Sequence, residues 1–345
     1  MQYIDMDKRS SIGKDKVKTM KWGIIGPGNI AKEFAEDLQY VQGKKCVIGP
    51  VLGKDLKNTQ EFVETFHGAL AAKTIYEFIK AAPDAAYIAT PHPLHFTQTM
   101  ACLENKIPVL CEKPLALNLR QVTALTDASK RNNTFLMEGM WTRFLPSFQF
   151  LLNVIKSGTI GEVLHVHADL SFIAEKDKNN RFFNPELGGG SLLDIGIYPI
   201  YLSYFLLGNP SEIFAAGKLT EAHIDEICGV MLRYNNGNFA LLESSIVTQT
   251  ENSAWIYGSE GTIRIKSPWT ERPRNIEVRI NSESSFRHIP SWKGRGFQYE
   301  VEEVIDCLEE DKIESTILPH SSSTHIAKIM DSIRSQLNIV YPNYE

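Results

Sequence analysis

Apolar residues in the first part of the chain alternate between short continuous runs and segments with a helical period. Residues 22–25 form an apolar run, and apolar residues at 30, 34, 38 and 41 then recur at spacings of three or four. The first pattern predicts a buried strand and the second an amphipathic helix. The alternation continues with predicted strands at 46–52, 85–89, 109–111 and 135–138 and predicted helices at 58–67, 75–82, 96–104 and 117–131. These segments predict a parallel, doubly wound sheet.

After about residue 142 the pattern changes to strand-like segments in which apolar and polar residues alternate. The turn Asn235-Asn236-Gly237 is typical of a β-hairpin. Predicted strands lie at 163–172, 213–219, 227–234, 238–245, 254–257, 261–266 and 276–280, and predicted helices within 188–206 and at 297–308 and 321–337. We expect an α+β domain built on a large, mostly antiparallel sheet.

Length and composition fit two domains. The 345 residues exceed the size of one typical core, and 43% of them are hydrophobic. Residues 1–19 are polar and lack the apolar core of a signal peptide, so we interpret them as an extension outside the fold. We expect a nucleotide-binding domain at 20–142 and a substrate-binding domain at 143–345, whose last helix packs back on the first domain.

Charge and cysteine content narrow the class of partner. The 36 Lys and Arg against 41 Asp and Glu give a net charge of −5, which argues against a nucleic-acid or anionic-membrane surface. We expect no apolar run long enough to cross a bilayer. The five cysteines are scattered and predict neither a disulfide framework nor a zinc site; no metal is expected. Reduced thiols favour a cytoplasmic protein.

A glycine-rich turn separates the first predicted strand from the first predicted helix. Gly26, Gly28 and Ala31 stand at the spacing G-x-G-x-x-A. Gly26 permits the turn, Gly28 lets a pyrophosphate approach the backbone, and Ala31 keeps helix and strand close. The helix N-terminus, at Asn29 and Ile30, presents unpaired N–H groups to phosphates. In this context the motif predicts a dinucleotide site; a plain structural turn is the alternative.

The end of the second predicted strand bears on the choice of cofactor. NAD enzymes place Asp or Glu about 20 residues after the glycines, where it binds the ribose hydroxyls. Here Gly53 and Lys54 occupy this region, and Asp55 follows. Since a cation suits a 2′-phosphate, Lys54 favours NADP, while Asp55 keeps NAD open. The alternative is that Lys54 is a solvated loop residue.

The strand at 85–89 leads into a polar turn with Thr90, Pro91, His92 and His95. Ligands of open α/β sheets lie at the carboxyl ends of the strands, so this turn is predicted to contact the cofactor. An equally weighted alternative is that both histidines cap and pack the turn.

The next strand end carries Glu112, Lys113 and Pro114. Proline restricts the preceding residue to extended conformations, which fixes the direction of Lys113. Taken alone, this pattern favours a surface lysine paired with Glu112.

Asp194 and Tyr198 stand four residues apart, after three glycines at 188–190. On a helix this spacing places both side chains on one face, and the glycines allow a ligand or another backbone to approach closely. Taken alone, the pair also fits a capping aspartate and a core tyrosine.

Three motifs follow one another in the chain: G-P-G-N-I-A at 26–31, C-E-K-P-L-A-L-N at 111–118 and G-G-G-S-L-L-D-I-G-I-Y-P at 188–199. In this order they resemble the glucose–fructose oxidoreductase and inositol dehydrogenase family, written Gfo/Idh/MocA. The resemblance extends from about residue 20 to the C-terminus. The stretch M-E-G-M-W-T-R-F at 137–144 resembles in particular the branch of dihydrodiol dehydrogenase and NADP-dependent D-xylose 1-dehydrogenase.

The resemblance implies a Rossmann domain followed by an open, mostly antiparallel sheet whose flat face mediates dimerisation. It also implies that Lys113 is the catalytic lysine, with Asp194 and Tyr198 as partners. Many members carry His in place of Tyr198, whereas the dihydrodiol branch carries Tyr. Many carry Asn where this chain has His92, which leaves the contact there open. The predicted cofactor-binding residues are Gly26, Gly28, Asn29, Ile30, Lys54, Thr90, Pro91, His92, His95, Glu112 and Lys113.

Oxidation of a secondary alcohol requires removal of the hydroxyl proton as hydride leaves the carbon. A phenol is a poor base at neutral pH, and a neighbouring ammonium lowers its pKa. We therefore expect Tyr198 to act as general acid/base, Lys113 as its electrostatic activator and donor to the substrate oxygen, and Asp194 as the orienter of substrate or lysine.

The predicted function is an NAD(P)-dependent oxidoreductase acting on a hydroxyl or carbonyl carbon of a sugar, polyol or trans-dihydrodiol. One alternative is a non-catalytic NADP(H)-binding regulator or sensor, against which the three candidate catalytic residues weigh together. Another is a family member that uses bound NAD to cleave glycosides. Weaker candidates for the substrate pocket, for which core packing is the alternative, are Trp141, Arg143, Phe144, Phe172 and Phe182.

Overall fold

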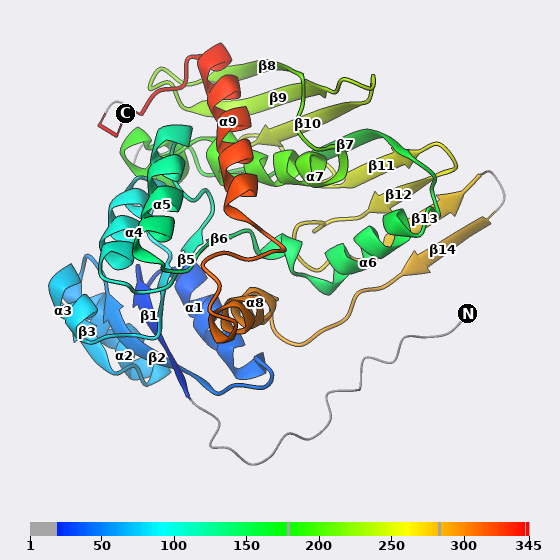
Figure 1. The fold of residues 1–345 in the computed structure, drawn as a ribbon. Helices are drawn as coiled ribbons and strands as arrows, with labels where there is room; N and C mark the ends of the chain where they lie inside the picture. Colours follow the sequence, from blue (N-terminus) through cyan, green and yellow to red (C-terminus); the bar gives the residue numbers. More distant parts are fainter. Residues whose placement is uncertain (1–18, 178–179, 282–283, 342, 345) are drawn as a thin grey trace.

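The structure is a computed structural model, and it describes residues 19–177, 180–281, 284–341 and 343–344 (Figure 1). The predicted N-terminal extension lies outside the described residues except for Thr19. Two sheets organise the described chain, one in each half of the sequence.

The first sheet has six parallel strands in the order β3-β2-β1-β4-β5-β6. This order places β1 beside β4, where the direction of winding reverses, and open sheets of this kind bind ligands at that point. The doubly wound fold is therefore confirmed. The strands are β1 Met20–Ile25, β2 Cys46–Leu52, β3 Leu70–Ala72, β4 Ala85–Ile88, β5 Val109–Glu112 and β6 Leu136–Gly139.

Helices cover both faces of this sheet, so consecutive residues of its strands point into two different cores. Tyr87 belongs to the core under α1, whereas Ile88 belongs to the core under α4 and α5. Both are fully buried, as expected for a parallel sheet. The helices of this half are α1 Asn29–Asp37, α2 Leu56–Phe66, α3 Ile75–Lys80, α4 His95–Glu104 and α5 Leu119–Asn132, with the short η1 Leu38–Tyr40 and η2 His92–Leu94.

The second sheet has eight strands in the order β14-β13-β12-β11-β7-β10-β9-β8, and all neighbours are antiparallel except β10 and β7. The α+β prediction is confirmed. The pattern missed the edge strands β3 and β14. β3 has only three residues, and β14 contains a single apolar residue, Phe286, so neither gives a periodic signal. The strands are β7 Val163–Ser171, β8 Glu212–Leu219, β9 Asp225–Arg233, β10 Phe239–Ser245, β11 Ala254–Gly258, β12 Gly261–Ile265, β13 Ile276–Ile280 and β14 Ser284–His288.

Helices α6 Pro146–Lys156 and α7 Ile197–Leu207 lie on one side of the second sheet (Figure 1). The chain then returns to the first sheet. Helix α8, Phe297–Glu309, packs against α1, and α9, His320–Leu337, contacts both α5 and α7. Short helical turns complete the chain: η3 Trp141–Arg143, η4 Arg181–Phe183, η5 Pro185–Leu187 and the π-helical segment Leu192–Gly196.

The stretch Pro185–Leu207 corrects one expectation. By length and composition it could cross a membrane, since its most apolar 18-residue window has a mean hydropathy of 1.3. However, 72% of its most apolar window is buried inside the protein. It contains the glycine turn and the π-helical segment before α7 begins. Its apolar residues therefore fill the core between the second sheet and α9.

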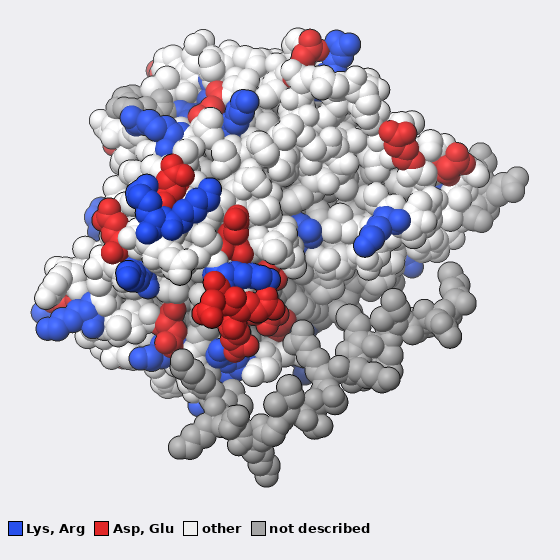
Figure 2. Space-filling model, in the orientation of Figure 1, with Lys and Arg blue, Asp and Glu red and all other residues white. Residues whose placement is uncertain are grey.

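Surface charge is mixed on the face seen in Figure 2. Acidic and basic side chains are interspersed there, and the densest group is acidic and lies over the region of α8. The sequence of helix α8 includes the acidic residues Glu302, Glu303, Asp306 and Glu309.

Candidate active site

The glycine-rich turn between β1 and α1 has the shape that a dinucleotide requires. Gly26 has a φ of +93°, and a Cβ there would lie 2.8 Å from the backbone of Ala89, so glycine is needed where β1 meets β4. A Cβ on Gly28 would meet nothing within 4 Å. Gly28 caps α1 without a side-chain hydrogen bond, and Ile30 is 44% exposed. The first turn of α1 is thus open to a phosphate group.

The end of β2 lies against this turn. A Cβ on Gly53 would lie 2.9 Å from the Pro27 ring. Lys54 follows and is exposed. Asp55 caps α2 by accepting a hydrogen bond from the Asn58 N–H at 2.8 Å. Because this cap occupies Asp55, Lys54 is the charged side chain available beside the turn, and the turn fits a dinucleotide that carries a 2′-phosphate.

His95 joins the ends of β4 and β5. Its Nδ1 lies 2.7 Å from the Pro114 carbonyl oxygen and its Nε2 lies 2.8 Å from the Thr90 carbonyl oxygen. The side chain is fully buried, and burial lowers its pKa. This corrects the prediction that His95 contacts the cofactor, because both ring nitrogens are occupied. The packing role, which the sequence left open, is the one observed.

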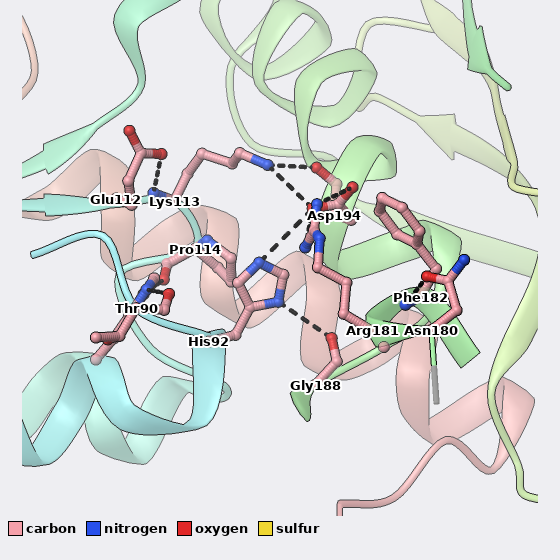
Figure 3. Close-up of polar contacts among 12 residues, drawn as sticks. Thr90, His92, Glu112, Lys113, Pro114, Asn180, Arg181, Phe182, Gly188 and Asp194 are labelled. Carbon is pink, nitrogen blue, oxygen red and sulfur yellow. Dashed lines mark hydrogen bonds and ion pairs between the residues drawn. The ribbon is translucent and has the colours of Figure 1, made fainter. Parts of the chain in front are cut away.

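Lys113 connects the two halves of the molecule (Figure 3). It follows β5, and its peptide bond to Pro114 is cis. Its ammonium donates to the backbone carbonyl of Asp194 at 2.5 Å and lies 3.6 Å from the Asp194 carboxylate. It also lies over the Tyr198 ring, 5.0 Å from the centroid. The lysine therefore meets both predicted partners, and its ammonium points away from Glu112.

Three further nitrogen atoms lie close to the Asp194 carboxylate. The Arg181 guanidinium donates to its carboxylate at 3.1–3.3 Å, and His92 Nε2 lies 3.8 Å from Oδ1. Burial alone raises the Asp194 pKa, but the charges of Lys113 and Arg181 outweigh it and lower the pKa to about 2. Burial lowers the His92 pKa to about 3, so this ring is neutral and donates from Nδ1 to the Gly188 carbonyl.

The pKa of Tyr198 shifts in the direction opposite to the one predicted. Burial, followed by the charges of Glu112 and Asp194, raises its pKa well above 10. The Trp141 indole N–H donates to the phenol oxygen, which opposes this shift. The net shift is therefore opposite to the lowering expected from Lys113, because burial and the two carboxyl groups outweigh any effect of the ammonium over the ring. The phenol is a proton donor at neutral pH.

Glu112 is a second carboxyl group beside the site. It accepts from the Tyr87 hydroxyl at 2.6 Å and from the Lys113 backbone N–H at 3.2 Å. Glu300 on α8 is fully buried, and neither carboxyl oxygen has a hydrogen-bond partner in the described structure. Burial raises the pKa of both residues, and the Glu112 charge raises that of Glu300 further. Burial therefore favours the neutral form of Glu300.

The predicted pocket residues separate into two groups. Phe172 and Phe182 make an edge contact at 4.7 Å, and the Arg181 guanidinium lies 4.1 Å from the Phe182 ring, so this group adjoins Asp194. Trp141 adjoins Tyr198. The other group is Arg143 and Phe144: the Arg143 guanidinium packs over Phe148 and Phe205, and Phe144 is buried in the main core. Core packing is thus the observed role of this second group.

Two residues of the site were missed from the sequence. Arg181 belongs to a short turn whose position relative to Asp194 depends on the tertiary fold, and no local pattern singles it out. Glu300 lies on the buried face of α8. A glutamate at an apolar position, among Phe297, Val301 and Val304, was the signal in the sequence that could have identified it.

Two family models match the chain. One is described as an oxidoreductase family with an NAD-binding Rossmann fold and matches residues 20–140. The other is described as the GFO/IDH/MocA C-terminal domain and matches residues 148–264.

Among curated proteins, the chain is 32% identical to trans-1,2-dihydrobenzene-1,2-diol dehydrogenase of Danio rerio, over 93% of this chain and 98% of that protein. Among solved structures it resembles a 3-ketoreductase from Actinomadura kijaniata in complex with NADP, with a TM-score of 0.82, 20% identity and coverage of 92% and 98% of the two chains. It also resembles levoglucosan dehydrogenase in complex with NADH and levoglucosan, with a TM-score of 0.83, 20% identity and coverage of 93% and 97%.

Proposed function

The chain belongs to the Gfo/Idh/MocA family and is an NAD(P)-dependent oxidoreductase, and we propose that it is an NADP(H)-preferring dehydrogenase of CH–OH groups in sugars, polyols or trans-dihydrodiols. The observation that carries this proposal is the position of Lys113. Its ammonium meets Asp194 and Tyr198 at the carboxyl end of β5, beside the point where winding reverses.

The bound nicotinamide supplies or accepts the hydride, and the protein supplies geometry and proton transfer. In the direction of carbonyl reduction, the Tyr198 phenol gives its proton to the carbonyl oxygen. Lys113 donates a hydrogen bond to the same oxygen with an N–H that Asp194 does not use, because an ammonium has three. The raised Tyr198 pKa keeps the phenol protonated for this role. In oxidation the same groups act in reverse, so the rate of oxidation rises with pH.

Lys113→Met and Tyr198→Phe test the catalytic proposal. Each is expected to lower turnover by about 10²–10⁴-fold, the usual contribution of a positioned acid or base. Binding of NADPH, followed by its fluorescence, is expected to persist in both. Near-normal turnover in both variants contradicts these roles. An NADPH-binding protein that turns over neither diols nor sugars fits the sensor alternative instead.

Preference for NADP rests on Lys54 and is supported by the NADP complex of the Actinomadura ketoreductase. Lys54→Asp is expected to weaken NADP binding selectively, since it places a negative charge beside the 2′-phosphate. Lys57→Asp is the control: Lys57 is also exposed but lies inside α2. An unchanged ratio of NADP to NAD affinity in Lys54→Asp contradicts the assignment.

The proposed substrate class is based on the names of the similar proteins. Their names include a dehydrogenase of trans-1,2-dihydrobenzene-1,2-diol and a dehydrogenase of levoglucosan. Phe172 and Phe182 beside Asp194 offer aromatic faces for a sugar or dihydroaromatic ring, and Asp194 and Arg181 offer polar contacts to its hydroxyls. Absorbance of NADPH across a panel of sugars, anhydro sugars and dihydrodiols identifies the class.

We also propose a homodimer formed through the second sheet. Its outer face carries a row of opposed side chains from β8, β9 and β10, namely Phe214, Met231 and Leu241, each 38–49% exposed. Leu241→Lys is expected to lower the mass measured by light scattering to that of one chain. Ile289→Lys, at a residue 72% exposed beyond β14, is the control. An unchanged dimer in Leu241→Lys contradicts this interface.

A cytoplasmic location remains part of the proposal. Its support is that the five cysteines are unpaired, as expected in a reducing compartment. Fractionation of the source cells, with the protein detected by antibody, tests it.

A further inference from the structure

Glu138 is a buried carboxylate that touches the segments of both proposed catalytic residues. It lies on β6 and is 4% exposed. Its Oε1 accepts from the Leu115 backbone N–H at 2.9 Å. Its Oε2 accepts from the Tyr201 hydroxyl at 2.6 Å and from the Ser323 hydroxyl at 2.5 Å. One side chain thus joins the loop after β5, helix α7 and helix α9.

The three donors differ in their relation to the site. Leu115 comes two residues after Lys113, and Tyr201 comes three residues after Tyr198, which is about one turn further along α7. Ser323 lies on α9, which carries none of the proposed catalytic residues. Through Leu115 and Tyr201, Glu138 is connected to Lys113 on one side and to Tyr198 on the other.

Packing reinforces this connection. A small cavity is lined by Glu138 together with Pro114, Leu193 and Ile197, which are sequence neighbours of Lys113, Asp194 and Tyr198. A Cβ on Gly139 would lie 3.3 Å from the Glu112 Cα, so β6 approaches β5 closely at this level. The carboxylate therefore occupies the place where the two segments come together.

The hydrogen bonds to Glu138 are of a strong type. Hydroxyl donors to a carboxylate at 2.5–2.6 Å are charge-assisted, and such bonds are about twice as strong as neutral ones. Burial raises the Glu138 pKa, while Ser323, Tyr201 and Leu115 oppose the shift by stabilising the charged form. These three hydrogen bonds tie the loop after β5, α7 and α9 to one carboxylate.

We propose that Glu138 is a positioning residue that fixes Lys113 relative to Tyr198 for the reaction, acting through Leu115 and Tyr201. The inference rests on the proposed function of that pair. A displacement of about 1 Å in a reacting group lowers turnover by about 10²-fold, so loosening this carboxylate is expected to reduce kcat.

The two hydroxyl donors to Oε2 provide a matched test. Tyr201→Phe and Ser323→Ala each delete one hydroxyl from the same carboxylate oxygen, but only Tyr201 shares a helix with Tyr198. We expect Glu138→Gln and Tyr201→Phe to lower kcat by about 10–100-fold. In both, the KM for NADP⁺ is expected to stay within about threefold, because the glycine turn is untouched. Ser323→Ala is expected to keep kcat within about threefold.

Thermal unfolding of each variant separates positioning from stability. We expect Tyr201→Phe and Ser323→Ala to lose similar amounts of stability, with kcat falling only in Tyr201→Phe. A kcat that falls equally in both, in step with stability, overturns the proposal and leaves Glu138 as a structural residue.

Hydrogen exchange measured by mass spectrometry gives a readout that needs no substrate. Residues 113–117 and 192–201 are expected to exchange faster in Glu138→Gln and Tyr201→Phe than in Ser323→Ala, relative to wild type. Equal exchange in these three variants also overturns the proposal. The activity assays use NADP⁺ with trans-1,2-dihydrobenzene-1,2-diol and with D-xylose. A wild-type protein inactive on both and across the wider panel contradicts the proposed function, while the exchange data still decide whether Glu138 orders the two segments.

Discussion

Two buried carboxyl groups flank Lys113 and have opposite surroundings. Asp194, across the junction between the sheets, faces the charges of Lys113 and Arg181, and its pKa is lowered to about 2. Glu112, the residue next to Lys113 in sequence, faces the Tyr87 hydroxyl and a second carboxyl, Glu300, and its pKa is raised. The side on which the ammonium lies determines which carboxyl group is securely ionised.

The difference shows how one lysine serves two purposes. Its backbone N–H supports Glu112, while its ammonium crosses to Asp194. A charge that is balanced by cations is held in a fixed place, whereas two neighbouring carboxyl groups share a proton instead of both ionising. Asp194 therefore fixes the position of the Lys113 ammonium. Glu112 instead acts on Tyr198, because its charge raises the Tyr198 pKa.

The largest expected effect comes from removing the charge on the Asp194 side. Asp194→Asn leaves Lys113 without its ionic partner and frees Arg181, so we expect turnover to fall by about 100-fold as the lysine loses its position. The free energy of unfolding is expected to fall by about 3 kcal/mol, the lower end for a broken buried pair, because Arg181 is half exposed and returns to water. Steady-state kinetics and urea unfolding measure the two effects.

Glu226→Gln is the matched control. Glu226 is also buried and also faces two cations, Lys176 at 2.8 Å and Lys218 at 3.0 Å, but both of these lysines are more than 60% exposed. We expect a loss below about 1 kcal/mol and unchanged turnover. If Asp194→Asn behaves like this control, the cations around Asp194 have no special role.

On the other side of Lys113, removal of a carboxyl group is expected to stabilise the protein. Glu300→Met replaces a fully buried side chain with no recorded hydrogen-bond partner by an apolar one of similar length. We expect the free energy of unfolding to rise by about 1–3 kcal/mol, since the cost of an unsatisfied buried polar group is removed. Urea unfolding measures it, and a clear loss of stability shows that Glu300 has a stabilising partner.

Most of the fold was predictable because its periodic patterns are local. The predicted strands at 85–89 and 109–111, whose ends lead into the site, appear within one residue of their expected ends. The edge strands β3 and β14 were missed because β3 has three residues and β14 has a single apolar residue. The helical prediction after 188–190 was right for α7, but Asp194 lies in a π-helical segment, which no residue pattern announced.

The site was predictable only in part. Motifs led to Lys113, Asp194 and Tyr198, and the structure brings the lysine to both partners. Which groups surround each one depends on contacts between distant segments: Arg181 at Asp194, and Glu300 beside Glu112. The direction of the Tyr198 pKa shift was predicted wrongly because the sequence placed an ammonium near the phenol without showing its burial or the charges of Glu112 and Asp194.

A smaller effect tests how Glu112 influences Tyr198. Glu112→Gln keeps an acceptor for the Tyr87 hydroxyl but removes the negative charge, so the Tyr198 pKa is expected to fall. The alkaline limb of carbonyl reduction then moves to lower pH, while turnover near neutral pH changes by less than about tenfold. Glu300→Gln is the control, because the raised pKa of Glu300 favours its neutral form, and replacing a neutral carboxyl group by an amide changes no charge. If the alkaline limb of the pH profile moves equally in both variants, or in neither, Glu112 and Glu300 do not differ in charge as proposed.

The last prediction concerns how the stability of the folded protein depends on pH on the Asp194 side, an effect that is small in any one pH unit. The pKa of His92 is about 3 in the folded protein and about 6.5 in the unfolded chain, so the unfolded state binds a proton first as the pH falls below 6.5. Its contribution to stability is therefore lost progressively between about pH 6.5 and pH 3, at no more than about 1.4 kcal/mol per pH unit. His92→Asn removes this dependence. Asp194 contributes in a separate window, because its pKa of about 2 means that its stabilisation is lost only as the pH falls from 3.8 towards 2.

Urea unfolding of wild type and His92→Asn at a series of pH values from about 7 down to about 4.5 isolates this residue. Other buried groups that titrate in this range, such as His95 and Asp225, contribute to both proteins and cancel in the difference. We expect the variant to gain stability relative to wild type as the pH falls. His67→Asn, at the C-cap of α2 and away from the site, controls for the substitution itself. A wild-type-minus-variant difference that stays constant with pH means that His92 accepts a proton in the folded state, and the Asp194 carboxylate then faces three cations instead of two.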